Sequence, residues 1–494
     1  MVLKIIVLTL YAGLIVRIGL AGLRRTRTFA DFFLGGGKVG PLMTAFTYGT
    51  AYFSAVLFIG FAGKIGWSFG LSGLWIALGN SLIGVLGVWL FLAPRVHDMS
   101  RSYGVATMAE FLEKRFKSRF LRFFAGSAVF VFFIPYTAAV FIGLSYLFLT
   151  TFGIPYEAAL IFMGLFTALY LTMGGYRSMV MIDVVFGMVM TGGVLLLLYG
   201  ALSKGGGLAA ILAGLRAVNP DLAAAVGPPG LWPLFSLVFL TSIAPFAMPQ
   251  LVQKFYAIRD RKAIRLGMIA STAFAVLVTG TAYFIGATTR VFLTPEGTPR
   301  AFPGGTPDFD ALIPELFLRI VPEGLLVIIM LLLLSASMST LAALVLMAGS
   351  ALARDIYAGF VKPDISDRGL TLMMRVLMAV FVLISVLLAF VRPATIVSIL
   401  AISWGAIGAT FLGPFIWGLF WKGTTRAGAV AGSIGALAVT LGLFLSAYPP
   451  PEAGTIGMLV SLALTPLISL AGRRRGQASF DSDEKAPALS RDVI

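Results

Sequence analysis

Three residues in the segment LLLLSASMSTLAALVLMAGSALARDIY have types and a spacing that suit a cation site. Ala336, Ser339 and Thr340 fall at positions i, i+3 and i+4, so they lie on one face of a helix. Hydroxyl and carbonyl oxygens are hard ligands, which suit sodium. Serine and threonine also join helices to one another or bond back to their own backbone. The spacing alone therefore leaves both an ion site and a helix contact open.

Ionisable side chains inside apolar stretches are costly and indicate functional sites. Asp183 lies in GGYRSMVMIDVVFGMVM, a few residues after a sharp turn predicted at the glycine pair. Its carboxylate either binds a cation on its way inward or is a structural acid paired with Arg177. Arg17 and Lys64 are two further ionisable candidates in apolar stretches. Lys64 either faces a solute at the outer mouth or extends its charged end to water.

Two of the apolar stretches predict interrupted helices. The stretch 41–65, PLMTAFTYGTAYFSAVLFIGFAGKI, mixes glycine, small hydroxyl residues and aromatic residues in its middle. The stretch 231–256, LWPLFSLVFLTSIAPFAMPQLVQKF, contains Pro245 and Pro249, each of which removes a helical hydrogen bond. Interrupted helices in corresponding positions of two halves indicate a binding site at the middle of a membrane.

Several classes of chemistry are excluded by composition. The chain has no cysteine, which excludes disulfides, thiolate metal sites and cysteine nucleophiles. The one histidine, His97, is predicted to lie in a solvated, charged loop. A membrane enzyme therefore has few groups to work with. The net charge of +16 does not indicate nucleic-acid binding, because that function needs a basic face on a soluble fold.

The elements that position these residues are membrane helices. Of the 494 residues, 59% are hydrophobic and 12% are charged, about half the charged share of soluble domains. Apolar runs long enough to cross a bilayer recur throughout, and they predict an all-α membrane protein with about thirteen spans. The predicted spans are 3–22, 41–65, 71–94, 121–150, 157–173, 179–200, 231–256, 266–289, 321–352, 369–391, 393–420, 427–447 and 454–471.

The basic residues predict how the chain is oriented in a cell (inner) membrane. With the N-terminus outside, the basic loops 95–120 and 254–265 and the tail 473–494 all face the cytoplasm. Lys254 is counted among these loop charges. The first span is predicted to be an anchor rather than a cleaved signal, because its basic cluster, Arg24, Arg25 and Arg27, follows the apolar run. The net charge is thus explained by topology.

Four motifs resemble the sodium/solute symporter family, which includes bacterial proline, pantothenate, sialic acid and sugar carriers. They are GTAYFSAVLFIGFAG, GGYRSMVMIDVVFG, SASMSTLAALVLMAGSALARDIY and WGAIGATFLGPFIWGLFWKGTTRAGAVAG. The resemblance implies a leucine-transporter-like core of two inverted repeats of five helices. The division that follows is an anchor and loop at 1–39, repeats at 40–205 and 206–425, peripheral helices at 426–472 and a cytoplasmic tail at 473–494.

The resemblance also implies a sodium site between the second and ninth spans. Its ligands would be the carbonyl groups of Thr50, Phe53 and Ala336 and the hydroxyl groups of Ser339 and Thr340. Some similar proteins hold a further sodium with the acid at the Asp183 position and two more hydroxyl groups. Here alanines, Ala342 and Ala343, occupy those hydroxyl positions, so we expect one sodium, with Asp183 guiding its release.

For the solute, the resemblance implies a pocket on the second, fourth and seventh spans. The expected lining residues are Val56, Leu57, Lys64, Tyr136, Ser242 and Phe246. Apolar residues stand at 56 and 57, where similar sugar carriers use carboxylate and amide groups, so a sugar is not expected. A small carboxylate, such as an amino acid (proline included) or a monocarboxylate, fits an apolar pocket near a cation and the ends of broken helices.

The predicted function is therefore sodium-coupled import of a small organic solute by alternating access. Its partners are the solute, sodium and the lipid bilayer; the sequence leaves the oligomeric state open. Two alternatives remain at this point. One is a proton-coupled carrier with Asp183 as the relay, and the other is a transporter-like receptor that senses solute without net flux.

Overall fold

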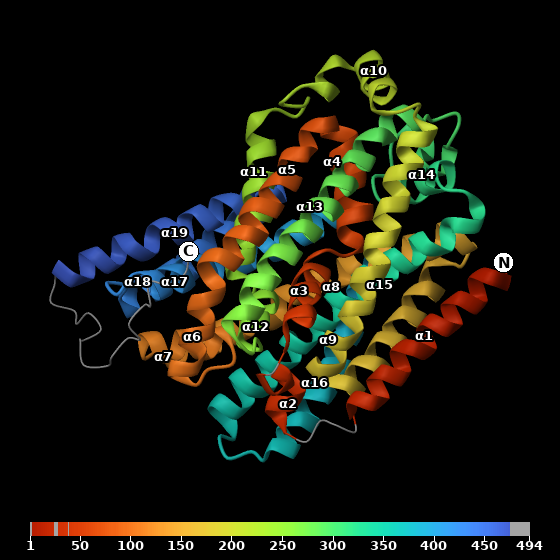
Figure 1. The fold of residues 1–494 in the computed structure, drawn as a ribbon. Coiled ribbons are helices and arrows are strands. Elements are labelled where there is room, and N and C mark those ends of the chain that lie inside the picture. Colours follow the sequence, from red (N-terminus) through yellow and green to blue (C-terminus); the bar gives the residue numbers. More distant parts are fainter. Residues whose placement is uncertain (1, 24–27, 38, 475–494) are drawn as a thin grey trace.

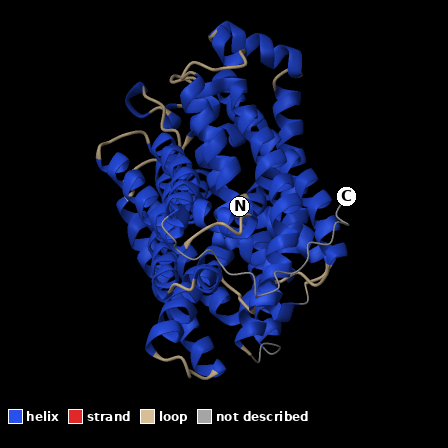
Figure 2. Ribbon diagram, turned by 90° about the vertical axis from the view of Figure 1, so that its left-hand side faces the viewer, coloured by secondary structure: helices blue, strands red, loops and turns tan. Residues whose placement is uncertain are grey.

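The protein is a bundle of long helices (Figures 1 and 2). The computed structural model describes residues 2–23, 28–37 and 39–474. Arg24, Arg25, Arg27 and residues 475–494 of the predicted tail lie outside this range. In the described part there are no strands, and one isolated backbone bridge joins Val39 to Ile258.

Most of the helices follow one another with short connections, but a longer one, residues 293–311, joins α13 to α14. Those of the first half are α1 (Val2–Leu23), α2 (Phe29–Leu34), α3 (Pro41–Tyr52), η2 (Val56–Phe61), α4 (Ala62–Phe69), α5 (Leu74–Gly79), η4 (Asn80–Leu92), α6 (Ala93–Tyr103), α7 (Met108–Phe116), α8 (Arg119–Phe152), α9 (Tyr156–Lys204) and α10 (Leu208–Val218). Those of the second half are α11 (Leu231–Ile243), η6 (Ala244–Ala247), α12 (Pro249–Tyr256), α13 (Arg261–Phe292), α14 (Leu312–Ile320), α15 (Leu326–Ser350), η10 (Ala351–Val361), α16 (Asp367–Val391), α17 (Ile396–Phe420), α18 (Arg426–Leu445) and α19 (Pro450–Arg474). Short 3-10 turns connect some of them: η1 (Gly35–Gly37), η3 (Gly70–Gly73), η5 (Pro220–Ala223), η7 (Pro299–Ala301), η8 (Pro303–Gly305) and η9 (Glu323–Leu325).

By length and apolar composition, 11 helical stretches in the described residues are able to cross a membrane. One of them, Val56–Tyr103, contains residues of both the second and the third predicted spans. The fifth predicted span corresponds to Tyr156–Thr172, a shorter apolar helix. The all-helical membrane fold is confirmed, whereas the number thirteen stays a prediction.

Both predicted interruptions are present. The first lies between α3 and η2, where Phe53 has an extended backbone (φ −107°, ψ 118°). The second lies between α11 and α12, where Met248 is extended directly before Pro249. Each interruption leaves backbone groups without their helical partners in the middle of the bundle. The two broken helices meet, because the Tyr52 hydroxyl donates to the Thr241 carbonyl group.

The predicted turn before Asp183 is also present. Gly175 has φ 60° and ψ −170°, which breaks α9 into two segments. A Cβ atom at this position would lie 2.7 Å from the ring of Phe32, so both the backbone angle and the close contact require glycine. The second segment of α9 then carries Asp183 into the core.

Helix α15 lies at the centre of the bundle and α1 at its edge. Within their most apolar windows, 83% of the α15 stretch is buried, against 17% of α1. Close packing around the first broken helix depends on small residues, since a Cβ atom on Gly66 would lie 2.0 Å from the backbone of Gly286. Three of the residues predicted to bind sodium, Ala336, Ser339 and Thr340, therefore lie on a highly enclosed helix.

Two ends of the bundle are distinguished in Figure 1. Helices α10 and α14 lie at one end, called here the α14 end, and α2 and α7 lie at the other, called the α7 end. One prediction about the α7 end was wrong. His97 is not solvated: it lies on α6, is 4% exposed, and contacts Asp98 at 3.2 Å.

Candidate functional site

The hydroxyl groups of α15 meet the end of α3 in the centre of the bundle. Ser339 Oγ lies 3.0 Å from Thr50 Oγ1. Thr340 Oγ1 lies 3.1 Å from the carbonyl oxygen of Ala51 and 3.2 Å from that of Ala336. All five residues are 0% exposed. The predicted residues Thr50, Ala336, Ser339 and Thr340 thus form one oxygen-rich cluster, and Ala51 joins it without having been predicted.

Phe53, the fifth residue predicted to bind sodium, lies where the first broken helix ends. Its amide still donates to the Gly49 carbonyl group at 3.2 Å, and its ring stacks on Tyr52 with 4.5 Å between centroids. The structure places Phe53 against the neighbouring cavity described below. The interruption therefore separates an oxygen cluster from an aromatic cavity by a few residues of backbone.

Asp183 belongs to the oxygen cluster. Its Oδ1 accepts a hydrogen bond from Ser339 Oγ at 2.6 Å. Its Oδ2 is buried and has no hydrogen-bond partner among the described residues. The residue is 0% exposed, whereas Arg177, the partner considered from the sequence, is exposed. A carboxylate, hydroxyl groups and carbonyl groups together form a donor set of the kind that hard cations prefer.

Next to this cluster is a small cavity of about 30 Å³. It is lined by Tyr52, Phe53, Ser54, Val56, Leu57, Phe61, Asn80, Tyr136, Thr241, Tyr283, Leu400 and Trp404. This volume is enough for about two waters. The lining side chains must move apart before an organic solute can enter.

Three of the six residues predicted to bind the solute line this cavity, namely Val56, Leu57 and Tyr136. The other three lie elsewhere. Ser242 is one residue beyond the lining residue Thr241 and donates from Oγ to Asn80 Oδ1 at 3.3 Å. Phe246 packs against Gly87 of η4, and Lys64 points to the α14 end, 5.8 Å from the ring of Phe309.

Asn80 and Trp404 are among the polar residues of the cavity that the sequence did not predict. Asn80 is 3% exposed and begins η4, a wide π-type helix of the kind that often occurs at functional sites. Trp404 also lines the cavity, and its indole N–H has no hydrogen-bond partner within residues 2–23, 28–37 and 39–474. A lone amide within the apolar run LSGLWIALGNSLIGVLGVW was a usable signal for Asn80. Nothing in the sequence distinguished Trp404 from the other tryptophans.

Charged residues gather above the cavity at the α14 end. Asp310 Oδ2 accepts from the amide of Ile396, the first residue of α17, at 3.2 Å. Burial and the neighbouring Asp308 raise the pKa of Asp310 to about 7, while Lys64 and Arg392 act in the opposite direction. Lys64 therefore belongs to a cluster that connects α4, α17 and the loop before α14.

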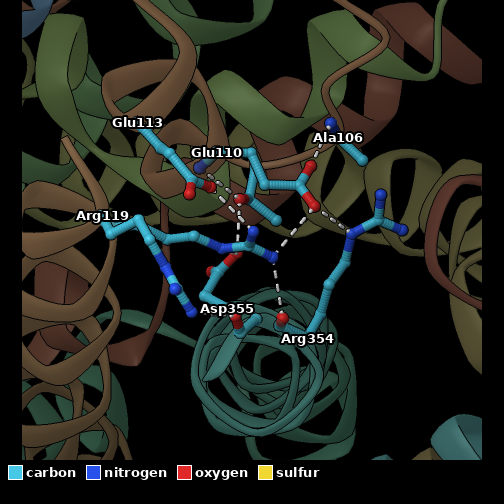
Figure 3. Close-up of polar contacts among 9 residues, drawn as sticks. Ala106, Glu110, Glu113, Arg119, Arg354 and Asp355 are labelled. Atoms are coloured by element: carbon cyan, nitrogen blue, oxygen red, sulfur yellow. Dashed lines mark hydrogen bonds and ion pairs between the residues drawn. The ribbon is translucent and has the colours of Figure 1, made fainter. Parts of the chain in front are cut away.

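A second charged network holds η10, which continues the C-terminal end of α15 (Figure 3). Arg354 Nε lies 2.6 Å from Glu110 Oε1, and Arg122 lies 2.8 Å from Glu113 and 3.5 Å from Glu110. Asp355 accepts from Thr107, and Arg122 also donates to the Arg354 carbonyl group. Burial alone would raise the pKa of Glu110, but Arg354, the Ala106 amide and Arg122 hold it below its ordinary value. The network fastens η10 to α7 and α8.

Comparison with known proteins gives the class of this protein. The model of the sodium:solute symporter family matches residues 32–436. The chain belongs to this family. It is a transporter, not an enzyme, and sodium is its co-transported ion.

Among relatives, the chain is 29% identical over 420 residues to the high-affinity proline transporter PutP of Bacillus subtilis, covering 84% of this chain and 87% of that one. It is 29% identical over 502 aligned residues to the sodium/pantothenate symporter of Escherichia coli, covering 95% and 96% of the two chains. A solved Na+-coupled sialic acid symporter in a substrate-bound outward-open state matches with a TM-score of 0.78 and 21% identity, covering 95% of this chain and 98% of that one. The leucine-transporter-like fold is thereby confirmed.

Proposed function

We propose that the chain imports a small carboxylate-bearing organic solute, such as an amino acid or a monocarboxylate, together with one sodium ion. The observation that carries this proposal is the aromatic cavity beside the oxygen cluster, with no charged side chain among its lining residues. A carboxylate there would be bound by N–H donors, including the unpartnered indole of Trp404 and the amide of Asn80, and by backbone groups at the helix break.

The sodium ligands in this proposal are the oxygen atoms of Thr50, Phe53, Ala336, Ser339 and Thr340, joined by the Ala51 carbonyl group. Asp183 guides the ion toward release. The alanines at 342 and 343 offer no further hydroxyl groups, which supports a single ion. Proline and pantothenate, the solutes named for two relatives, each carry a carboxylate, and this agrees with the proposed solute class.

The cycle follows from the two broken helices. Sodium bound between α3 and α15 favours the state in which solute binds beside the break, and both ligands then reach the opposite side. A ligand shifts such an equilibrium only by its differential affinity for the two states. We place the α7 end in the cytoplasm, the N-terminus outside, and the two repeats at 40–205 and 206–425.

The test is uptake into proteoliposomes that contain the purified protein. Radiolabelled L-proline, pantothenate, lactate and glucose are offered with and without an inward sodium gradient. We expect uptake of at least one carboxylate, dependent on sodium, and no uptake of glucose. Uptake driven by a pH gradient without sodium would favour proton coupling, and uptake of glucose alone would reject the proposed solute class.

A further inference from the structure

Helix α12 carries a buried polar face that the sodium and solute sites leave unused. Gln250, Gln253 and Lys254 fall at positions i, i+3 and i+4 of this helix, and their exposed fractions are 1%, 0% and 3%. Gln253 donates to the Phe33 carbonyl group of α2 at 3.0 Å. The charged member of this face is Lys254. Its predicted position in a cytoplasmic loop is wrong, because the residue lies on α12 and is buried. A buried ammonium group inside a membrane bundle requires a counter-charge.

In the described part of the chain, the contacts given for the Lys254 ammonium group are with a thioether and an aromatic ring. Its Nζ lies 4.0 Å from Met179 Sδ and 5.0 Å from the centre of the Tyr176 ring. Within the described part of the chain, the ion pairs do not include Lys254. An aromatic face and a thioether stabilise a cation less than a carboxylate does.

A carboxylate lies one helical turn beyond Met179 on α9, the helix that carries both neighbours of the Lys254 ammonium group. Tyr176, Met179 and Asp183 occupy positions i, i+3 and i+7 of α9, so they are stacked on one face. The rise of about 1.5 Å per residue puts Asp183 roughly 6 Å beyond Met179 along the axis. Asp183 and Lys254 each act electrostatically on the other. No residue in the described part of the chain hydrogen-bonds to Asp183 Oδ2.

We propose that Lys254 is an internal cation that competes with sodium for Asp183. When sodium is absent, the flexible lysine stem carries the ammonium group from Tyr176 and Met179 toward Asp183 Oδ2. When sodium enters the cluster of Ser339 and Asp183, the second cation is repelled and returns to the aromatic ring. The proposal rests on the sodium site of the proposed function.

The physical reason is the cost of a lone charge in a low-dielectric interior. A carboxylate that loses its cation without a replacement is strongly destabilised there. A tethered cation removes this penalty from the sodium-free carrier and also weakens sodium binding, because sodium must displace it. Both effects favour release of the ion after transport.

The experiment measures binding of radioactive sodium to the purified, full-length protein. Lys254→Met keeps the length and apolar stem of the side chain and removes the charge. We expect the half-saturating sodium concentration to fall by about tenfold, the scale of coupling between adjoining sites. Lys254→Arg keeps the charge, so its half-saturating sodium concentration should stay within about threefold of that of the unmodified protein.

A double-variant cycle tests whether the effect passes through Asp183. In an Asp183→Asn background, Lys254→Met should change the half-saturating concentration by less than about threefold, because the contested carboxylate is gone. If Lys254→Met alone does not fold, the comparison in the Asp183→Asn background decides, because the double variant has no buried charge at either position. A change in half-saturating sodium concentration larger than about threefold in that background rejects the competition.

Three results bear on the two proposals separately. An unmodified protein that binds no sodium contradicts the proposed function. Sodium binding that is present but unchanged by Lys254→Met shows that the ammonium group is only a structural partner of Tyr176 and overturns the internal-cation proposal. The internal-cation proposal is also overturned if Lys254→Met tightens sodium binding by the same factor in the Asp183→Asn background as in the unmodified protein.

Discussion

At the scale of single residues, two hydroxyl groups on α15 hold the centre of the site together. Ser339 contacts both Thr50 and Asp183, and Thr340 contacts the Ala51 carbonyl group. Each hydroxyl group connects α15 to another helix through oxygen atoms that face one another. Oxygen atoms that lie this close together are stabilised either by hydrogen bonds between them or by a cation that they bind.

The first prediction concerns these hydroxyl groups. Ser339→Ala combined with Thr340→Ala removes two of the proposed ligands. The half-saturating sodium concentration for uptake should rise by at least about tenfold, because a hydrogen bond or ligand to a charge contributes about 1.5–3 kcal/mol. Sodium-dependent uptake in proteoliposomes measures the effect. Ser385→Ala is the control, because this buried serine bonds only to the Phe381 carbonyl group of its own helix. Unchanged sodium dependence would remove these residues from the site.

The second prediction concerns pH. Burial raises the pKa of Asp310 to about 7, so the folded protein holds this proton more tightly than the unfolded chain does. Stability contributed by the protonated group is present below the ordinary pKa of about 4 and is lost as the pH rises to about 7, at about 1.4 kcal/mol per unit.

Asp310→Asn keeps an oxygen acceptor for the Ile396 amide and has no charge to bury. Thermal unfolding of the purified protein between about pH 5 and pH 8 should therefore depend less on pH in this variant. The exposed Asp364→Asn is the matched control and should unfold like the unmodified protein. Equal pH dependence of all three proteins would contradict the assignment to Asp310.

Residue types and spacing predicted the oxygen cluster because helical periodicity places i, i+3 and i+4 together regardless of the surroundings. Lys254 could not be assigned in the same way. Its burial depends on α2 and α9 packing over α12, which are contacts distant in sequence. Similarly, Trp404 faces the cavity only because α17 packs beside both broken helices.

At the scale of elements, proline and glycine predicted the interruptions correctly, because their effects on the backbone are local. The two prolines end α11 and begin α12, and Gly175 turns α9. The lengths and types of the helical segments were less predictable from the sequence. Helices α3, η2 and α4 form one interrupted crossing, and η2, η4 and η10 are of the wide π type, which depends on packing rather than on composition.

The third prediction concerns the network that fastens η10 to α7 and α8. Arg122→Met removes the partner of Glu113 and one partner of Glu110 (Figure 3). Removing one member of a buried ion pair costs about 3–5 kcal/mol, and the 15% exposure of the Arg122 side chain points to the lower end. We expect a lower midpoint of thermal unfolding and, because η10 continues α15, weaker sodium binding.

Arg368→Met provides the comparison for this variant. Arg368 is exposed on α16, so the same change in charge and length should leave both measurements close to those of the unmodified protein. A loss of stability without any change in sodium binding would show that the network supports the fold but does not act on the ion site.

At the scale of the whole molecule, two charged clusters lie on opposite sides of one buried site. The cluster of Asp310 and Lys64 joins helices at the α14 end, and the network of Glu110, Arg122 and Arg354 joins helices at the α7 end. Alternating access requires contacts at one end to separate while those at the other remain. Under the alternating access proposed above, these two clusters are the contacts that would break in turn.

The last prediction concerns which end faces the cytoplasm. Because the chain has no cysteine, single cysteines introduced at exposed positions report their side without background labelling. Thr306→Cys lies in the loop before α14, and Ser102→Cys lies on α6 toward the α7 end; both positions are exposed. With an impermeant maleimide, Thr306→Cys should react in intact cells and Ser102→Cys only after permeabilisation. The reverse labelling pattern would invert the proposed orientation. Asp183 and Lys254 lie on the α7 side of the cavity, so they would then be on the entry path of sodium rather than on its exit path.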